Sequence, residues 1–418
     1  MTTTTSHPAT AGDGALRLRY LAEVSGLLWP APVRAGLGVA GGSVLSEFVL
    51  VPDAKRPRLL VPAGPGHRRA AAAAVRRYTE PGSVKQRLLL RTLSAALATG
   101  IGGVAMRRRF RVCADNGAGP VGTIETYLRE VLDPDLVVSL AIGPARANRK
   151  PVLQLLTPGG ATIGFAKLGV NDLTRSLARA ERDSLRSLQA AALRHLTVPE
   201  VLHHGRWNGL EVLVLTPLRV WEPRVERSAE RLAAAMREIA AIGGGTEGPL
   251  RDSPYWTALG DRLGALADGE SVRALRRAYA DIGDRAGDTR LRYGSWHGDW
   301  TPWNMATLRD TLLVWDWERF ATGVPLGFDA VHYAFQGAVV RQGADPLVAV
   351  SETVDRAAEL LGPFEVTGGA RLTALLYLAD IAVRYLADEQ AEAGARLGKL
   401  GQWLLPVLID QVERLHVD

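Results

Sequence analysis

Residues 294–320 read Gly-Ser-Trp-His-Gly-Asp-Trp-Thr-Pro-Trp-Asn-Met-Ala-Thr-Leu-Arg-Asp-Thr-Leu-Leu-Val-Trp-Asp-Trp-Glu-Arg-Phe. The stretch holds His-Gly-Asp at 297–299, then Asn304 five residues after Asp299, and Asp316 after a short apolar run. These residue types at this spacing seldom occur together by chance. A tight loop followed by a hairpin would bring two carboxylates and an amide oxygen together.

That combination suits a magnesium-dependent transfer of a phosphoryl group. One carboxylate orients the attacking hydroxyl, and the other oxygens hold the metal on the nucleotide phosphates. We assign Asp299 to the hydroxyl and Asn304 to the metal; a surface turn and a helix or loop cap are their plainer alternatives. Asp316 follows a buried strand, where a carboxylate is costly unless it is paired, so metal binding is favoured.

Three neighbouring residues have supporting or open roles. His297 is expected to pack and to hydrogen-bond the loop backbone rather than to titrate. Glu318 could join the metal site or pair with Arg319, and the pair is slightly favoured because two-residue spacing does not ensure convergence. Asp329 either caps the helix that follows it or hydrogen-bonds the catalytic loop, and both are scaffold roles.

Composition describes an ordinary globular protein. The chain has 418 residues, 47% hydrophobic and 22% charged, with a net charge of +6 that suits anionic ligands without indicating nucleic acid. The single cysteine fits a reducing cytoplasm, and the Ala, Gly, Arg and Leu bias suggests a bacterial source. The longest weakly polar stretch, 93–106, is too short to span a membrane.

The first third of the chain carries no chemical motif. Residues 1–14 are polar and expected to be disordered. Residues 15–134 are predicted to form an accessory α/β region, with a hairpin at 48–61, helices at 67–78 and 83–98 (Ser83 as a cap), a strand at 107–112 and a helix at 123–132. Its basic helices could touch a membrane surface, a partner or an anionic substrate, but a solvated basic face is favoured.

Residues 135–217 are predicted to form a small β-rich lobe. Strands at 136–142, 151–156 and 161–168 form a meander, a helix covers 171–191, and a hairpin turns at Asn208-Gly209. Lys167 lies in an apolar strand, where it could reach nucleotide phosphates, and Glu181 in the next helix could hold it. A solvated lysine and a surface glutamate are the alternative.

Residues 218–418 are predicted to be mostly helical, with helices at 228–241, 254–267, 271–286, 328–340, 346–361, 370–391 and 397–416. Asp380, Arg384 and Asp388 lie on these helices without a pattern that names a substrate. Trp300 and Trp303 crowd the loop at 297–304, where they could pack or form an aromatic platform beside the acceptor.

The motifs at 297–304 and 316–318 resemble the signature of the aminoglycoside phosphotransferase and choline kinase group, within the protein-kinase-like superfamily. The segments Val198–Gly205, Leu213–Leu218 and Pro325–Asp329 are also similar to segments of that group, in the same order. The resemblance covers about 136–340. It implies an α+β, bilobal kinase-like fold, here preceded by the extra N-terminal region.

The resemblance also implies roles. Asp299 would be the catalytic base, and Asn304 and Asp316 would bind magnesium. Lys167, paired with Glu181, would contact the α and β phosphates of ATP. The linker residues Leu215, Thr216 and Leu218 would contact adenine, although the choice between ATP and GTP stays open. The segment 143–150, which would cover the phosphates, is poor in glycine for this group.

We therefore expect an ATP- and magnesium-dependent phosphotransferase acting on a hydroxyl of a small molecule such as a sugar or an amino sugar. The alternatives are a kinase acting on Ser or Thr of a peptide, and a catalytically silent kinase-like binding module. Fold and signature do not set the acceptor. A polycationic acceptor would favour an acidic cleft, which the net charge does not support.

Overall fold

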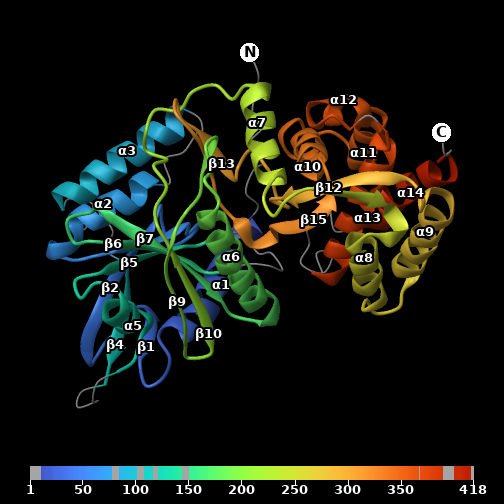
Figure 1. The fold of residues 1–418 in the computed structure, drawn as a ribbon. Helices are drawn as coiled ribbons and strands as arrows, with labels where there is room; N and C mark the ends of the chain where they lie inside the picture. The colour runs from blue at the N-terminus through green and yellow to red at the C-terminus, as the bar shows by residue number, and fades with distance from the viewer. Residues whose placement is uncertain are drawn as a thin grey trace. The chain divides into compact units, whose positions relative to one another are not determined.

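The computed structural model describes residues 11–77, 84–100, 108–115, 121–143, 150–366, 368–388 and 400–415. The chain has a mixed α+β fold, as predicted, and divides into two compact units (Figure 1). The sheet unit comprises Met1–Ala145, Arg149–Ala178 and Val201–Pro217. The helical unit comprises Arg146–Asn148, Arg179–Glu200 and Leu218–Asp418.

The sheet unit is built on one nine-stranded sheet with the strand order β1-β4-β2-β3-β5-β6-β7-β10-β9. Each pair of neighbouring strands is antiparallel. The strands are β1 (Arg34–Leu37), β2 (Ser43–Val51), β3 (Leu59–Pro62), β4 (Arg109–Ala114), β5 (Val137–Ala141), β6 (Val152–Leu156), β7 (Thr162–Gly169), β9 (Val201–Trp207) and β10 (Leu210–Leu215).

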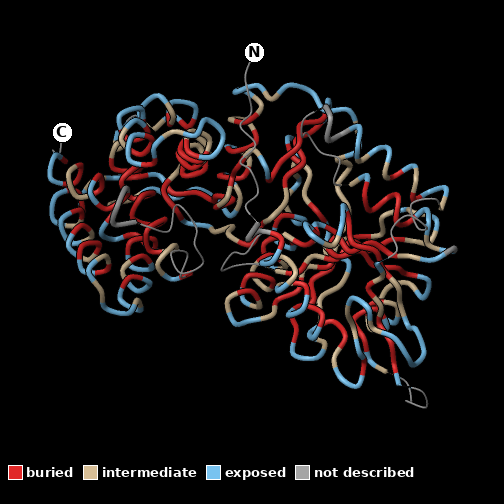
Figure 2. Tube along the Cα trace, turned by 180° about the vertical axis from the view of Figure 1, so that it is seen from behind, coloured by how far each residue is buried: buried red, intermediate tan, exposed pale blue. Residues whose placement is uncertain are grey.

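Successive side chains of a strand point to opposite faces of its sheet, so consecutive apolar residues let this sheet bury both faces. In β2, Phe48 and Leu50 pack with helices α1 (Ala11–Leu28) and α5 (Ile124–Val131). Their neighbours Val49 and Val51 pack on the other face with the alanine-rich helix α2 (Arg68–Arg77), next to α3 (Val84–Thr99). The short helix η1 (Pro65–His67) precedes α2. Figure 2 shows the resulting buried strands with exposed segments around them.

Most predicted elements of this unit are confirmed, but the predicted boundary near residue 135 falls inside the sheet. Strand β3 pairs with β5 through Leu60 and Leu140, so strands of the accessory region continue the sheet of the small lobe. Helix α1 begins at Ala11, within the predicted disordered tail. The predicted cap Ser83 lies outside the described residues. The Asn208-Gly209 turn has positive φ at both positions, as its hairpin requires.

The helical unit contains two three-stranded sheets, β11-β12-β15 and β13-β14-β8. The strands are β8 (Leu196–Thr197), β11 (Thr246–Pro249), β12 (Arg290–Trp296), β13 (Met305–Thr307), β14 (Leu312–Val314) and β15 (Ala321–Pro325). Helix α6 (Asp172–Ala190) contributes its residues from Arg179 onward to this unit. The short helical turns are η2 (Leu250–Asp252), η3 (Trp317–Arg319), η4 (Gly337–Arg341, a π-helix) and η5 (Gly362–Phe364).

The longer helices of this unit are α7 (Ala229–Ala240), α8 (Pro254–Gly264), α9 (Glu270–Ala286), α10 (Phe328–Gln336), α11 (Pro346–Asp355), α12 (Ala357–Leu361), α13 (Ala370–Ala387) and α14 (Leu400–Glu413). The predicted helix 346–361 is broken at Arg356 into α11 and α12. Helix α13 is buried along most of its length and runs through the main core. Among the described residues, every helix is too short or too polar to cross a membrane.

Candidate active site

A loop between two strands of the helical unit carries the predicted catalytic residues. It begins after Trp296, the last residue of β12, and ends at Met305, the first residue of β13. Strands β13 and β14 form a hairpin in which the Trp315 backbone N–H donates to the Asn304 carbonyl at 3.1 Å. The hairpin therefore brings Asn304 beside the end of β14, where Asp316 follows.

Gly298 gives the loop its tight path. Its φ is +82°, and a Cβ at this position would lie 2.2 Å from the carbonyl oxygen of Arg319. Both the left-handed conformation and the close backbone approach exclude a side chain here. The glycine of the His-Gly-Asp motif is thus a steric requirement of this loop.

Asp329 anchors the loop from helix α10. Its Oδ2 accepts from the His297 backbone N–H at 2.7 Å, and its Oδ1 accepts from the Gly298 backbone N–H at 3.2 Å. The cap position of α10 is Gly327, which has no side-chain cap. Of the two scaffold roles left open by the sequence, the structure shows the bond to the catalytic loop.

His297 is buried and hydrogen-bonded at both ring nitrogens. Its Nδ1 accepts from the Asp299 backbone N–H at 3.1 Å, and its Nε2 lies 3.1 Å from the Trp315 carbonyl oxygen. Those partners require a neutral ring with the proton on Nε2. Burial, opposed by nearby Asp299 and Asp316, lowers the pKa of His297 to about 4, which agrees with that neutral form. His297 is therefore packed and hydrogen-bonded within the loop.

Both carboxylate oxygens of Asp299 are held in place. Oδ2 accepts from Asn304 Nδ2 at 2.8 Å, and Oδ1 accepts from His332 Nε2 at 3.2 Å. The side chain is still 34% exposed, so a ligand can reach it. Burial acts to raise its pKa, but the hydrogen bond from His332, helped by the positive charge of Arg384, outweighs burial, and the pKa of Asp299 is lowered. A lowered pKa keeps the carboxylate ionised at neutral pH.

His332 lies outside the sequence motifs, in α10 three residues after Asp329. Residues three apart in a helix share a face, so both side chains can reach the same loop. The Tyr377 hydroxyl, from α13, lies 3.0 Å from His332 Nδ1, and His332 and Tyr377 are fully buried. The i, i+3 spacing from Asp329 was the signal in the sequence that could have identified His332.

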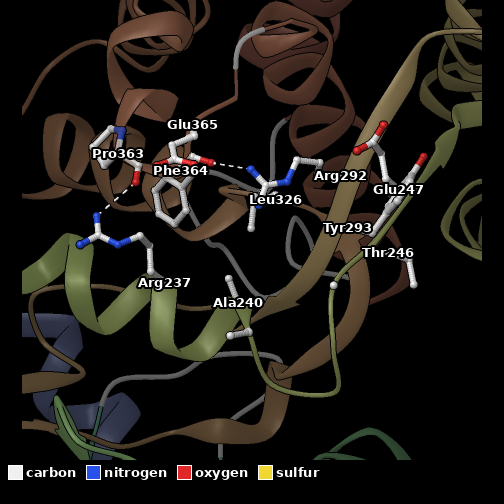
Figure 3. Close-up of a pocket in the computed structure, with 12 residues that line it drawn as sticks. Arg237, Ala240, Thr246, Glu247, Arg292, Tyr293, Leu326, Pro363, Phe364 and Glu365 are labelled. Atoms are coloured by element: carbon white, nitrogen blue, oxygen red, sulfur yellow. Dashed lines mark hydrogen bonds between the residues drawn. The ribbon is translucent and has the colours of Figure 1, made fainter.

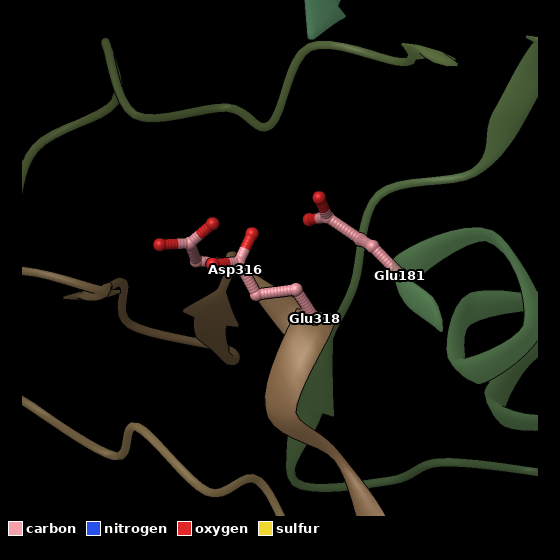
Figure 4. A group of neighbouring side chains, drawn as sticks. All are labelled: Glu181, Asp316 and Glu318. Atoms are coloured by element: carbon pink, nitrogen blue, oxygen red, sulfur yellow. The ribbon is translucent and has the colours of Figure 1, made fainter. Parts of the chain in front are cut away.

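Three carboxylates converge after strand β14 (Figure 4). Asp316, Glu318 and Glu181 each place an oxygen within 4.8 Å of the others. Glu181, from α6, also accepts a hydrogen bond from the Trp317 backbone N–H at 3.2 Å. The three side chains offer only carboxylate oxygens as ligand atoms. Hard cations such as Mg²⁺ prefer oxygen ligands, so the donor set fits magnesium.

The sequence slightly favoured an ion pair between Glu318 and Arg319. The structure instead shows Arg319 paired with Asp388. Asp316 adopts φ +74°, a left-handed conformation that non-glycine residues seldom use. Such strain concentrates at functional sites because the surrounding structure must enforce it.

The predicted nucleotide-binding residues are divided between the units: Lys167, Leu215 and Thr216 belong to the sheet unit, and Glu181 and Leu218 to the helical unit. Lys167 is in β7, opposite Leu213 of β10, and it alternates with Ala166 and Leu168, which lie in the core. Lys167 is therefore on the other face of the sheet. Leu215 ends β10 and Thr216 follows, whereas Leu218 begins the next segment of the helical unit. Residues 144–149 of the predicted phosphate-covering segment lie outside the described residues.

Asp380 and Arg384 of α13, and Asp388 at its C-terminal cap, have separate partners. Asp380 pairs with Arg262 at 2.7 Å, and Asp388 pairs with Arg319. Arg384 donates from Nη1 to the Gly298 carbonyl oxygen at 2.6 Å, so it brings positive charge to the loop at 297–304.

The two loop tryptophans have different environments. Trp300 is fully buried and its ring lies 5.7 Å from that of His297, so it packs. Trp303 is 42% exposed, directly before Asn304. Trp303 is thus the loop tryptophan that an acceptor could contact.

A separate pocket of about 480 Å³ lies elsewhere in the helical unit (Figure 3). Arg237 and Arg292 line it and donate to the carbonyl oxygens of Pro363 and Phe364 at 3.1 and 3.2 Å. None of the predicted site residues lines this pocket. It is therefore not the site built around Asp299.

Asp329 gives a testable pH dependence of stability. Burial, opposed by its two backbone hydrogen bonds, raises the pKa of Asp329 from 3.8 to about 7. Its contribution to the free energy of unfolding is therefore fully present below pH 3.8 and is lost as the pH rises through 7. We expect the wild type to lose on the order of 2 kcal/mol more than Asp329→Asn between about pH 5 and 8 in urea unfolding. Parallel pH curves for the two proteins would contradict this assignment.

Comparison with known proteins gives a likeness only at the level of structure. No protein-family model and no curated protein matches the sequence. A thermostable mutant of aminoglycoside phosphotransferase APH(4)-Ia, solved as a ternary complex with AMP-PNP and hygromycin B, is similar at 16% identity and a TM-score of 0.47. The match covers 69% of this chain and 98% of that chain.

Two further solved structures are similar at lower TM-scores. The GDP and kanamycin complex of APH(2")-IIIa matches at 15% identity and a TM-score of 0.41, covering 69% of this chain and 97% of that chain. A choline/ethanolamine kinase family protein from Mesorhizobium loti matches at 14% identity and a TM-score of 0.37, covering 65% of this chain and 87% of that chain. A likeness of this degree does not transfer an activity. The solved structures named here are two aminoglycoside phosphotransferases and a choline/ethanolamine kinase family protein.

Proposed function

We propose that the chain is an ATP- and magnesium-dependent phosphotransferase that moves the γ-phosphoryl group to a hydroxyl of a small molecule. The observation that carries the proposal is the state of Asp299. Its carboxylate is accessible, it is kept ionised, and both of its oxygens are fixed, by Asn304 and by His332. A carboxylate held in this way is suited to orient a hydroxyl for attack and to take its proton.

The reaction needs little covalent chemistry from the protein. The acceptor oxygen bonds to the γ-phosphorus while the bond to the β–γ bridging oxygen breaks, ADP leaves, and the hydroxyl proton passes to Asp299. The transition state of phosphoryl transfer is loose, so accurate positioning contributes more than a strong base. The anchors on the loop, Asp329 on its backbone and Gly298 at its turn, supply that positioning.

Asn304 and Asp316 would hold magnesium, and Glu318 and Glu181 offer further oxygens beside Asp316. The ion would neutralise charge on the nucleotide phosphates. Lys167, with Glu181, for the α and β phosphates, and Leu215, Thr216 and Leu218 for adenine, follow from the resemblance and stay predictions.

With Asp316, Glu318 and Glu181 assigned to the metal, the remaining charges near the loop favour a neutral or anionic acceptor over a polycation. Arg384 binds the Gly298 carbonyl, and Arg227 lies 3.5 Å from the Pro302 carbonyl. Arg319 is neutralised by Asp388. The exposed face of Trp303 would suit the apolar face of a sugar ring.

A panel of hydroxyl compounds incubated with γ-labelled ATP and Mg²⁺, read by mass shift, tests the proposal. The panel comprises neutral sugars, sugar acids, amino sugars, polycationic aminoglycosides and Ser/Thr peptides. We expect label on neutral or acidic sugars in preference to polycations. Preferential labelling of the peptides would replace the small-molecule acceptor, and labelling of polycations alone would contradict the charge argument.

A further inference from the structure

Helix α10 holds the loop at two points, and only one of them concerns the backbone. Asp329 binds backbone N–H groups, whereas His332 binds the Asp299 carboxylate itself. His332 is completely buried, and its second ring nitrogen lies 3.0 Å from the Tyr377 hydroxyl. A buried histidine with both nitrogens engaged has a defined orientation and a defined proton.

The chemistry of the three partners fixes where that proton lies. An ionised carboxylate only accepts hydrogen bonds, so His332 Nε2 must carry the hydrogen that points to Oδ1. Burial lowers the pKa of His332, although the hydrogen bond to Asp299 opposes the shift, so the ring is neutral at pH 7. Its Nδ1 is then an acceptor, and the Tyr377 hydroxyl must be its donor. The hydrogen bonds therefore run from Tyr377 through His332 to Asp299.

We propose that His332, oriented by Tyr377, is a positioning residue that fixes the rotation of the Asp299 carboxylate for phosphoryl transfer. Because Nε2 already carries a proton, His332 cannot take one from Asp299 there. Its effect is to stop the carboxylate from turning and to leave the free lone pairs directed to the acceptor. The inference rests on the proposed function for its catalytic meaning.

Several other titratable and charged groups also face Asp299. The titratable and charged groups that face it are His297 in its own loop, Asp316 and Arg319 after β14, Asp329 and His332 in α10, and Tyr377, Tyr385 and Arg384 in α13. Of these, His332 is the group with a side-chain hydrogen bond to Oδ1 of Asp299.

Substitution of His332 separates positioning from packing. His332→Leu fills the space without a donor, whereas His332→Gln keeps an N–H near the position of Nε2. With ATP, Mg²⁺ and water as acceptor, we expect His332→Leu to lower kcat between about 10-fold and 100-fold. We expect KM for ATP to stay within about threefold, and His332→Gln to recover most of the rate.

Tyr377→Phe should give a smaller loss in the same direction. Tyr255→Phe is the matched control, because Tyr255 is also buried and donates to the Leu376 carbonyl at 3.2 Å without reaching Asp299. Equal losses of kcat in His332→Leu and His332→Gln would overturn the positioning role, provided that thermal denaturation shows both variants to be folded. An unchanged rate in His332→Leu would do so as well.

A second measurement does not depend on turnover. In ¹⁵N-histidine-labelled protein, NMR should show a His332 ring with the proton on Nε2, and its signal should shift in Asp299→Asn and in Tyr377→Phe. A proton on Nδ1, or a signal indifferent to both changes, would overturn the inference even in an active enzyme. Absence of any magnesium-dependent ATP hydrolysis in the wild type, with the NMR signature present, would instead contradict the proposed function and leave the hydrogen-bonded chain standing.

Discussion

Asp299→Asn should lower kcat for phosphoryl transfer by about 10²–10⁴-fold while leaving the affinity for nucleotide within about tenfold. The amide keeps the size of the side chain and can still accept from Asn304 or from His332. It cannot take the proton of the acceptor hydroxyl, and its NH₂ group would face one of two hydrogen-bond donors. The loss should therefore appear in kcat, measured by release of labelled γ-phosphate, with binding measured by calorimetry.

The control for this substitution is Asp288→Asn. Asp288 is an exposed aspartate just before β12 that pairs with Arg251 at 2.9 Å, and we expect its turnover to stay at the wild-type level. Retained turnover in Asp299→Asn would remove Asp299 from the role of base. A loss of nucleotide affinity as large as the loss of kcat would place this residue in nucleotide binding instead.

Asp316→Ala should abolish the part of nucleotide binding that depends on magnesium. Asp316 is the carboxylate at the end of β14, it is held in a left-handed conformation, and it lies among Glu181 and Glu318. Removing a partner of a metal ligand typically weakens metal binding about 10–100-fold, so removing a ligand should cost at least about 100-fold in Mg²⁺-dependent affinity. Calorimetric titration of the protein with ATP, once in Mg²⁺ and once in EDTA, separates magnesium-dependent from magnesium-independent nucleotide binding.

Asp310→Ala is the matched control, because Asp310 is an exposed aspartate in the same β13–β14 hairpin, paired with Arg219 at 2.9 Å. Its Mg²⁺-dependent affinity should be unchanged. If Asp316→Ala binds Mg²⁺ and ATP as the wild type does, the metal site is not the one assigned here. A pure loss of folding would show as a lowered Tm in the absence of ligand.

Local patterns predicted much of this molecule. The alternation of β5, β6 and β7, the Asn208-Gly209 turn and the helical periodicities of the second half each depend on neighbours in sequence. The motif residues Asp299, Asn304 and Asp316 also lie within one loop and one hairpin, so spacing alone could bring them together. For the same reason, Gly298 could be read as the position of a tight turn.

Long-range pairing was beyond those patterns. Strand β3 joins β5 through Leu60 and Leu140, so a boundary drawn from the change in pattern near residue 135 cut one sheet in two. The pairing of Arg319 with Asp388 joins segments 69 residues apart. Glu181 reaches Asp316 from a helix far earlier in the chain. None of these contacts leaves a periodic signal in sequence.

Release of γ-phosphate from labelled ATP by the purified chain, with and without Mg²⁺, tests phosphoryl transfer by this loop without knowledge of the acceptor. We expect slow hydrolysis that requires Mg²⁺ and disappears in Asp299→Asn and Asp316→Ala. Hydrolysis that persists in both variants, or none in the wild type with Mg²⁺ and ATP bound, would contradict the claim that this loop transfers phosphate.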